Sequence, residues 1–216
     1  MLTPRRLVSA EMLDEPDAPL DDVDRSLRDL RMINHYGGGV RIYRRLVRIF
    51  SPGSILDLGT GTSDLLESVP QVRLRVGMDF KIEHLVYIRT PGIHKVVGDA
   101  RRLPFRDESI DLVTSAHFLH HFSPGENVAM IDDALRATRM GVAINDTRRH
   151  YVPLIVVLLA GLFRLVGRIT RFDAPASVRQ GYTLDEAREI ARKTRCARWQ
   201  VRRAWPFRFA LLLWKR

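Results

Sequence analysis

The sequence predicts an α/β fold built on a mostly parallel sheet, and two observations support this prediction. The apolar run at residues 55–58 ends at Gly59 and Gly61, which let the backbone turn sharply and approach a ligand closely. Further apolar runs follow at the spacing of βαβ units, and two of them end in an acid, Asp79 and Asp99. Because open α/β sheets bind ligands outside the carboxyl ends of their strands, these acids are expected to converge there.

The glycine loop narrows the class of cofactor. A dinucleotide fingerprint needs a third glycine where this chain has Asp64, and this argues against a nicotinamide or flavin cofactor. The Gly-x-x-x-x-Gly-Lys-Ser/Thr pattern of a phosphate-binding P-loop does not occur in the sequence either. The arrangement that remains, Asp57 before Gly59 and Gly61 at the end of the first strand, resembles motif I of the class I S-adenosylmethionine (SAM) methyltransferases.

This resemblance covers about residues 50–214 and implies the fold in more detail. It implies a Rossmann-like class I methyltransferase fold with a seven-stranded, mostly parallel sheet and an antiparallel C-terminal hairpin. An N-terminal helical cap and a helical insertion after the fifth strand complete the expectation. The strands are expected near residues 55–58, 72–78, 96–97, 109–115, 142–146, 197–203 and 207–214.

The resemblance also implies SAM as the cofactor and suggests its ligands. Asp79 lies twenty residues after Gly59, where an acid accepts hydrogen bonds from ribose hydroxyls. In the family, an acid at the position of Asp99 meets the adenine amino group. The expected cofactor-binding residues are Asp57, Gly59, Thr60, Gly61, Asp79, Phe80, Asp99, Ala100 and Ser115.

Methyl transfer from a sulfonium is an in-line displacement, so the enzyme mainly aligns the acceptor and, for a hydroxyl, removes a proton. His117, His120 and His121 follow the fourth strand and are candidates for this general base. They are alternatively helix-turn residues, or one of them stacks near the adenine. No metal is expected, because the sequence shows no evident carboxylate cluster of the kind a metal-dependent catechol site needs. Rival bases at the end of the fifth strand are Asp146, His150 and Tyr151.

The predicted organisation is one domain with two additions. Residues 1–18, rich in proline and charge, are expected to be flexible, and residues 19–216 to form a single methyltransferase domain. Within it, residues 19–50 form a helical cap that breaks at three glycines, 37–39, and residues 150–172 form an apolar helical insertion. Beside the glycine break, the candidates for a lid over the cofactor are Asn34, His35 and Tyr36, although a simple turn between helices explains them equally well.

The insertion contains thirteen residues without a charge, 151–163. This run is too short to span a bilayer, because a transmembrane helix needs about 20 apolar residues. Three interpretations stay open: a buried core helix, a helix lying on a membrane, or the wall of an apolar substrate pocket. Arg164, Arg168 and Arg171 follow the run and are suited to snorkelling at a membrane interface. Peripheral contact with a membrane is therefore one expectation.

The net charge of +10 is unevenly placed. Residues 190–216 hold nine Lys or Arg, no acid and all three tryptophans, a mixture suited to RNA or to an anionic membrane. The same residues are also explained as the closing strands of the sheet, with arginines on a solvated face. The single cysteine, Cys196, excludes an internal disulfide framework, and the N-terminus lacks the apolar core of a signal peptide, so the expected location is the cytoplasm.

The first functional hypothesis is transfer of a methyl group from SAM to an apolar small molecule (a phenol, quinone precursor or polyketide) by O- or C-methylation. Ser177-Val178-Arg179 resembles a segment of bacterial methyltransferases related to the ubiquinone and menaquinone C-methyltransferases and to those acting on polyketide phenols. The alternatives are an RNA methyltransferase that uses the basic C-terminal region, and a non-enzymatic SAM-fold protein. Nucleic acid is not the expected partner, because the fourth strand lacks the Asn/Asp-Pro-Pro-Tyr/Phe arrangement of amino-group methylases.

Overall fold

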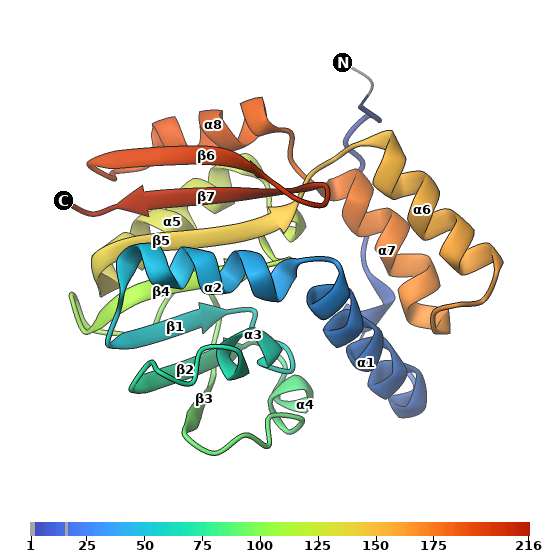
Figure 1. Cartoon of the computed structure of the whole chain (residues 1–216), viewed down its shortest axis with the longest axis horizontal. Coiled ribbons are helices and arrows are strands. Elements are labelled where there is room, and N and C mark those ends of the chain that lie inside the picture. Colours follow the sequence, from blue (N-terminus) through green and yellow to red (C-terminus); the bar gives the residue numbers. More distant parts are fainter. Residues whose placement is uncertain (1–2, 16) are drawn as a thin grey trace.

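A seven-stranded sheet in the order β3-β2-β1-β4-β5-β7-β6 organises the chain (Figure 1). The computed structural model describes residues 3–15 and 17–216. Neighbouring strands from β3 to β5 run parallel, whereas β7 is antiparallel to both β5 and β6. The predicted fold class is therefore confirmed. The strands are β1 (Ser54–Leu58), β2 (Leu74–Asp79), β3 (Ile93–Val97), β4 (Ile110–Ala116), β5 (Thr138–Thr147), β6 (Arg198–Ala204) and β7 (Arg208–Trp214).

Several strand boundaries differ from those expected, most of all in β5. The apolar run predicted residues 142–146, but the strand extends from Thr138 to Thr147 because both of its edges are paired. Its polar first residues are held by β4, where Ile110 pairs with Thr138, and by the Thr138 hydroxyl, which donates to the Asp111 carbonyl. Pairing with neighbours thus lengthens a strand beyond its apolar core.

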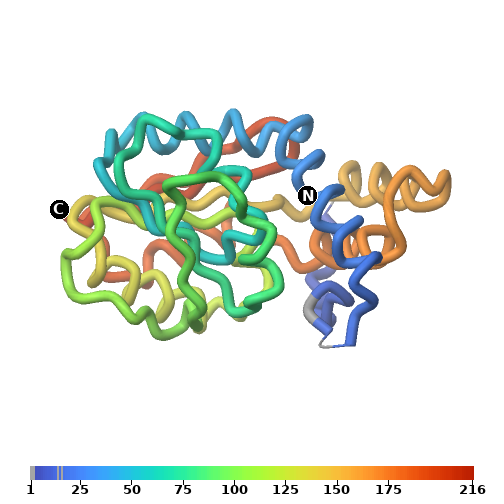
Figure 2. Tube along the Cα trace, turned by 90° about the horizontal axis from the view of Figure 1, so that it is seen from below, coloured from blue at the N-terminus to red at the C-terminus, as the bar shows by residue number. Residues whose placement is uncertain are grey.

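Helices cover both faces of the sheet (Figure 2). One face carries α2 (Gly39–Phe50), α3 (Asp64–Glu67) and α4 (Ile82–Leu85), whose apolar residues share a core with β1 and β4. The other face carries α5 (Pro124–Ala137) and α8 (Leu184–Lys193), which bury Met130 and Ile190 against the sheet. This layering leaves the carboxyl ends of the parallel strands open for a third group of helices.

That third group lies beyond the carboxyl ends of the parallel strands, on the right in both views (Figures 1 and 2). It consists of α1 (Leu20–Tyr36), α6 (Tyr151–Leu162) and α7 (Arg168–Gln180). The α1–α7 contact buries Val23, Leu27 and Ile169, and the Asp29 carboxylate accepts a hydrogen bond of 2.7 Å from the Gly167 amide. The expected cap and insertion are thus joined to each other, and α7 continues past residue 172 to Gln180.

Residues 3–15 run along α7 toward the carboxyl ends of the strands and include the short helix η1 (Met12–Asp14). The Asp173 carboxylate accepts hydrogen bonds from the amides of Met12 (2.8 Å) and Leu13 (2.9 Å), while the Lys81 ammonium donates to the Leu13 carbonyl (2.7 Å). Residues 1, 2 and 16 of the segment expected to be flexible lie outside the described residues, and the flexibility of residues 1–18 stays a prediction.

The apolar insertion forms α6, which is mostly exposed to solvent. Only Leu154 and Gly161 are buried within it, so α6 is not a core helix. In the described part of the chain, no helix combines the length and the apolar character that crossing a bilayer requires.

Candidate functional site

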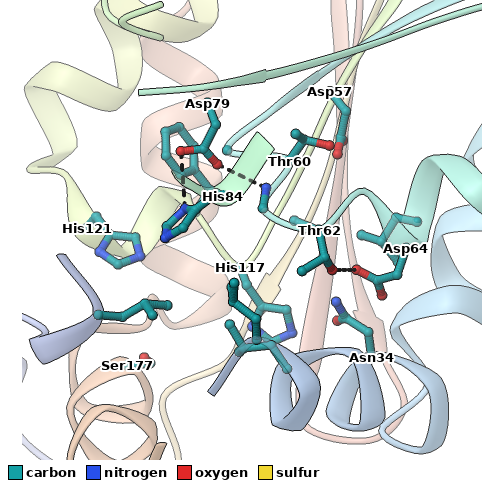
Figure 3. A pocket seen from close by; sticks show the side chains of 18 of the residues that line it. Asn34, Asp57, Thr60, Thr62, Asp64, Asp79, His84, His117, His121 and Ser177 are labelled. Atoms are coloured by element: carbon teal, nitrogen blue, oxygen red, sulfur yellow. Dashed lines mark hydrogen bonds and ion pairs between the residues drawn. The ribbon is translucent and has the colours of Figure 1, made fainter. Parts of the chain in front are cut away.

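Two adjoining pockets lie at the carboxyl ends of β1, β2 and β4. Gly59, Asp79 and Phe118 line both pockets, so Phe118 stands between them. The first pocket extends from the loop after β1 toward α1, α7 and the N-terminal segment, and Figure 3 shows its lining. The second extends along the ends of β2 and β3. Most of the predicted cofactor residues meet here, as expected for an open α/β sheet.

The two glycines after β1 serve different purposes. Both adopt left-handed backbone conformations, with φ of +64° at Gly59 and +51° at Gly61, which β-carbon-bearing residues rarely adopt. A Cβ at Gly59 would lie 2.3 Å from the Phe118 ring, so this glycine allows Phe118 to pack on the loop. A Cβ at Gly61 would meet nothing within 4 Å. Gly61 therefore presents bare backbone to the first pocket.

Asp79 connects the end of β2 to the glycine loop. Its carboxylate accepts hydrogen bonds from the amides of Gly61 (2.9 Å) and Lys81 (3.1 Å), and Nδ1 of His84 lies 3.3 Å away (Figure 3). Burial opposes ionisation, but the bond to His84 and the two amides outweigh it and hold the pKa of Asp79 below its ordinary value. The carboxylate is thus ionised and fixed at the junction of the two pockets, where a ribose is expected.

Besides Gly59 and Asp79, the predicted cofactor residues Phe80, Asp99 and Ala100 line the second pocket. The Asp99 carboxylate is bound by the Arg101 guanidinium through Nε (3.0 Å) and Nη2 (2.7 Å), and this bond lowers the pKa of Asp99. Phe80 is largely exposed, so its ring lies open at the rim. The roles predicted for these residues in adenine binding stay predictions.

Asp57 and Thr60 line the first pocket, whereas Ser115 does not. The Thr114 hydroxyl donates to the Asp57 carboxylate at 2.6 Å, and burial raises the pKa of Asp57 to about 6. Ser115 is buried and its hydroxyl donates to the Leu58 carbonyl (3.2 Å), behind the pocket wall. The structure therefore brings the other predicted residues to the two pockets but leaves Ser115 outside their lining.

The first pocket is lined by four carboxylates, and within the described residues its lining includes no Lys or Arg. SAM carries a sulfonium and an ammonium against one carboxylate, so an anionic pocket suits it better than it suits a nucleotide phosphate. Burial first, and then the charges of Asp64 and Asp79, raise the pKa of Asp57. The four acids are Glu11, Asp57, Asp64 and Asp79.

His117 lines the first pocket as a half-buried, neutral imidazole. Burial, together with the buried Arg208 guanidinium nearby, holds the pKa of His117 well below its ordinary value. Its Nδ1 lies 3.0 Å from the Thr147 hydroxyl, and its Nε2 has no hydrogen-bond partner among the described residues. The backbone of His117 is left-handed, with φ of +51°, a conformation that is uncommon outside glycine and is typical of functional sites.

His120 is buried between two carboxylates. Its Nδ1 lies 2.8 Å from Asp146, and its Nε2 lies 3.6 Å from Glu11. Burial by itself would lower the pKa of His120, but Asp146 and Glu11 outweigh it and raise that pKa to about 10. His120 is therefore a cation at neutral pH and already holds the proton that a general base would have to accept.

The remaining candidates lie at or beyond the edge of the first pocket. His121 lines it and stacks on His120, with ring centroids 4.3 Å apart. Asp146 does not line the pocket but contacts two residues that do, His120 and Phe118. His150 caps α6 and accepts from the Val152 amide at 3.1 Å. Tyr151 begins α6, and of the lid candidates, Asn34 lines the pocket whereas His35 and Tyr36 do not.

One group of side chains in the described part of the chain has the spacing to hold a metal ion. The candidate ligand atoms of Glu11, His120 and His121 lie within 4.8 Å of one another. The same geometry is accounted for by the His120 cation between Glu11 and Asp146, and this ion network needs no metal. The expectation of a metal-free site stays a prediction.

Glu11, His84 and Ser177 are among the lining residues that were not predicted from the sequence as part of the site. The Ser177 hydroxyl donates to Glu11 at 2.6 Å, and Gln180 donates to the same oxygen at 3.2 Å. Glu11 lies in the segment expected to be flexible, where no apolar periodicity indicates a buried residue. His84 follows Asp79 by five residues, and this closeness to a predicted ribose ligand is the one signal in the sequence that could have identified it.

Comparisons with known proteins agree with this geometry. The family described as "Methyltransferase domain" matches residues 55–141. A demethylmenaquinone methyltransferase of Mycobacterium sp. (strain KMS) is 38% identical over 92 residues, which cover 42% of this chain and 39% of that protein. A human protein named "Probable tRNA methyltransferase 9B" is 37% identical over 81 residues, which cover 37% of this chain and 18% of that protein. The chain thus spans well under half the length of these curated relatives.

Among solved structures, the plantazolicin methyltransferase BpumL in complex with S-adenosylhomocysteine (SAH) is similar over nearly its whole length. The superposition has a TM-score of 0.70 at 13% identity and covers 95% of this chain and 93% of that one. At this identity the likeness shows the fold alone, and the matched methyltransferase domain covers less than half of this chain.

Asp79→Ala is expected to weaken SAM binding by about 1.5 to 3 kcal/mol, the usual contribution of a charged hydrogen-bond partner. Calorimetry on the folded variant measures this change. Glu83→Ala is the matched control, because Glu83 is an exposed acid on neighbouring α4. Unchanged affinity in Asp79→Ala would remove Asp79 from the cofactor site.

The affinity for SAM is expected to rise about tenfold between pH 5 and pH 7 and then to level off. The pKa of about 6 at Asp57 means that the carboxylate loses its proton over this range, and only the ionised form attracts the cationic cofactor. Titrations at several pH values measure the effect. In Asp57→Asn the slope should disappear, and a slope that persists in this variant would assign it to another group.

Proposed function

Since residues 55–141 belong to the methyltransferase domain family and the chain has the class I SAM-dependent methyltransferase fold, we propose that it transfers a methyl group from SAM to an apolar small molecule. The acceptor class is a phenol, quinone precursor or polyketide, methylated on oxygen or carbon. The single observation that carries the catalytic part of this proposal is His117, a neutral imidazole whose buried Nε2 has no hydrogen-bond partner among the described residues and lies in the first pocket.

The cofactor is proposed to occupy both pockets. Its adenosine lies along Phe80 and Asp99 in the second pocket, with the ribose hydroxyls at Asp79. Its sulfonium and ammonium lie in the first pocket, near the bare backbone of Gly61 and the carboxylate of Asp57. The acids concentrated in the first pocket support this placement, because they suit the cationic end of the molecule.

The proposed reaction is a single displacement. An acceptor oxygen or carbon attacks the methyl carbon, the carbon–sulfur bond breaks, and its electron pair stays on sulfur to give neutral SAH. For a phenol, the leaving proton passes to Nε2 of His117, while Nδ1–H donates to the Thr147 hydroxyl. Because burial and Arg208 disfavour the charged imidazole, His117 is unprotonated before the reaction and releases the proton afterwards.

An apolar acceptor is supported by three leucines in the lining of the first pocket. Leu13 comes from the N-terminal segment, and Leu27 and Leu30 come from α1. One of the three interpretations made the insertion the wall of an apolar substrate pocket. No residue of α6 lines either pocket, so the apolar lining comes from these leucines instead. A flat aromatic ring is well matched to such a wall.

His117→Ala is expected to lower turnover by about 10²- to 10⁴-fold with SAM affinity nearly unchanged, since it removes a base but no cofactor ligand. The rate is measured with an acceptor identified by mass spectrometry of products labelled from SAM. His94→Ala, on the exposed edge of β3, is the control. If His117→Ala retains wild-type turnover while His121→Ala loses it, the base is His121 instead.

An RNA methyltransferase is the second candidate, because the structure contains a basic groove between α2 and β6. The groove is lined by five arginines, Arg41, Arg45, Arg48, Arg202 and Arg203, and by the exposed Trp205. Guanidinium groups beside an exposed aromatic ring suit a phosphate backbone and a stacked base. The similarity to the human tRNA methyltransferase relative covers only part of each chain and adds modest support.

Labelled SAM distinguishes the two candidates. When the protein is incubated with total RNA and with a lipid extract of cells, the label is expected in organic-soluble material, while the RNA stays at background. Arg45→Glu with Arg202→Glu should leave this transfer unchanged, because neither residue lines the two pockets. Label in RNA that the double variant abolishes would establish the RNA candidate. SAM binding without transfer to either fraction would favour a non-enzymatic protein.

A further inference from the structure

The outer face of α6 exposes many large apolar side chains. Between Tyr151 and Phe172, large side chains from α6, from the turn after it and from α7 stand in solvent, and exposure reaches 73% at Leu162 and 68% at Phe163. Contiguous apolar surface of this kind marks a contact site in soluble proteins. Its members are Tyr151, Val152, Ile155, Val156, Leu158, Leu159, Leu162, Phe163, Leu165 and Phe172.

The charges within the segment that carries this apolar face have one sign. Residues 151–172 contain no acid and three arginines, Arg164, Arg168 and Arg171, all of them exposed. Arg168 lies 3.7 Å from Asp22 of α1 and is partly balanced by it. The stem of Arg171 packs on α6, since a Cβ at Gly161 would lie 2.6 Å from its Cγ. Arginines whose apolar stems lie along an apolar surface hold their guanidinium groups at its border.

The position of α6 leaves this face free. In Figures 1 and 2, α6 is the outermost helix beyond the sheet, and its packing partner is α7. Behind it, α7 contacts α1 and carries Ser177 into the first pocket. One helix thus separates the apolar face from the pocket that we propose receives the acceptor.

We propose that the outer face of α6 docks the protein on an anionic lipid surface. The apolar side chains enter the boundary between headgroups and acyl chains, and the three arginines meet the lipid phosphates. The idea that the membrane delivers a lipid-soluble acceptor rests on the proposed function. The docking itself rests only on the exposed apolar side chains and the arginines of residues 151–172.

A second copy of the chain is a weaker occupant for this face. Isologous pairing through α6 would bring the arginines of both copies toward each other, and residues 151–172 hold no carboxylate to balance them. An anionic membrane supplies that balance. Charge complementarity therefore favours lipid over self-association.

Vesicle flotation tests the proposal. The full chain is mixed with vesicles of phosphatidylcholine alone or with phosphatidylglycerol added, at salt concentrations raised stepwise from low ionic strength. We expect association with the anionic vesicles, much less with the neutral ones, and a fall as salt screens the arginines. Leu162→Glu should reduce the partition coefficient at least tenfold. Val86→Glu, at another exposed apolar position, adds the same charge elsewhere and should reduce it much less.

Substitutions of the three arginines test the electrostatic contribution and leave the apolar side chains intact. Each of Arg164→Gln, Arg168→Gln and Arg171→Gln should weaken anionic-vesicle binding by roughly fivefold, the equivalent of about 1 kcal/mol for one basic residue near such a surface. Circular dichroism verifies that every variant is folded, and calorimetry with SAM reports on the cofactor site separately. A protein that binds vesicles but not SAM would refute the proposed function and leave the docking intact.

Four results would overturn the docking proposal. The first is no association with anionic vesicles at low salt, and the second is equal vesicle binding by Leu162→Glu and wild type. The third is salt-sensitive binding to RNA that is tighter than binding to vesicles. The fourth is a wild-type protein that does not bind vesicles but forms a dimer, which Leu162→Glu dissociates. The last result would assign the face to a second copy of the chain.

Discussion

The site depends on the burial of one cation, His120, between two carboxylates. Asp146 comes from the end of β5, His120 from the turn after β4, and Glu11 from the N-terminal segment. A buried ion that loses its partner costs about 3 to 5 kcal/mol, so these three parts of the chain are stable only together. Asp146 also accepts the amide of Phe118 at 3.0 Å. The same carboxylate therefore fixes the turn that carries His117 and the ring that stands between the two pockets.

The sequence predicts well those site residues whose positions follow from a short local pattern of strand and loop. Asp57 and Asp79 each lie at the carboxyl end of a buried strand, and parallel pairing of β1 with β2 necessarily brings these ends together. Gly59 and Gly61 reveal the turn, because other residues rarely adopt its backbone angles. Strand order follows from the family resemblance, whereas strand ends do not, since pairing with neighbours and not apolar periodicity determines where β5 begins.

Other features depend on contacts that no local pattern contains. Glu11 is held by Ser177 and His120, which lie far along the sequence, and no pattern in its own segment indicates these partners. The three histidines looked equivalent, yet burial and the surrounding charges leave His117 neutral and make His120 a cation. The uniform apolar character of α6 left three interpretations open, and it did not predict that most of this helix is exposed to solvent. These distinctions arise from the tertiary environment, which determines solvation and electrostatic partners.

The contact between Ser177 and Glu11 spans 166 positions of the sequence, and this separation has a consequence for how the protein matures. Closing so long a loop costs entropy that nearby contacts do not incur, so the contact forms after the local βαβ units. On the ribosome, the glycine loop and its acids emerge well before α7 is made. The nascent domain therefore completes the floor of its cofactor site first, and encloses the methyl-transfer side only when α7 returns to meet the N-terminal segment.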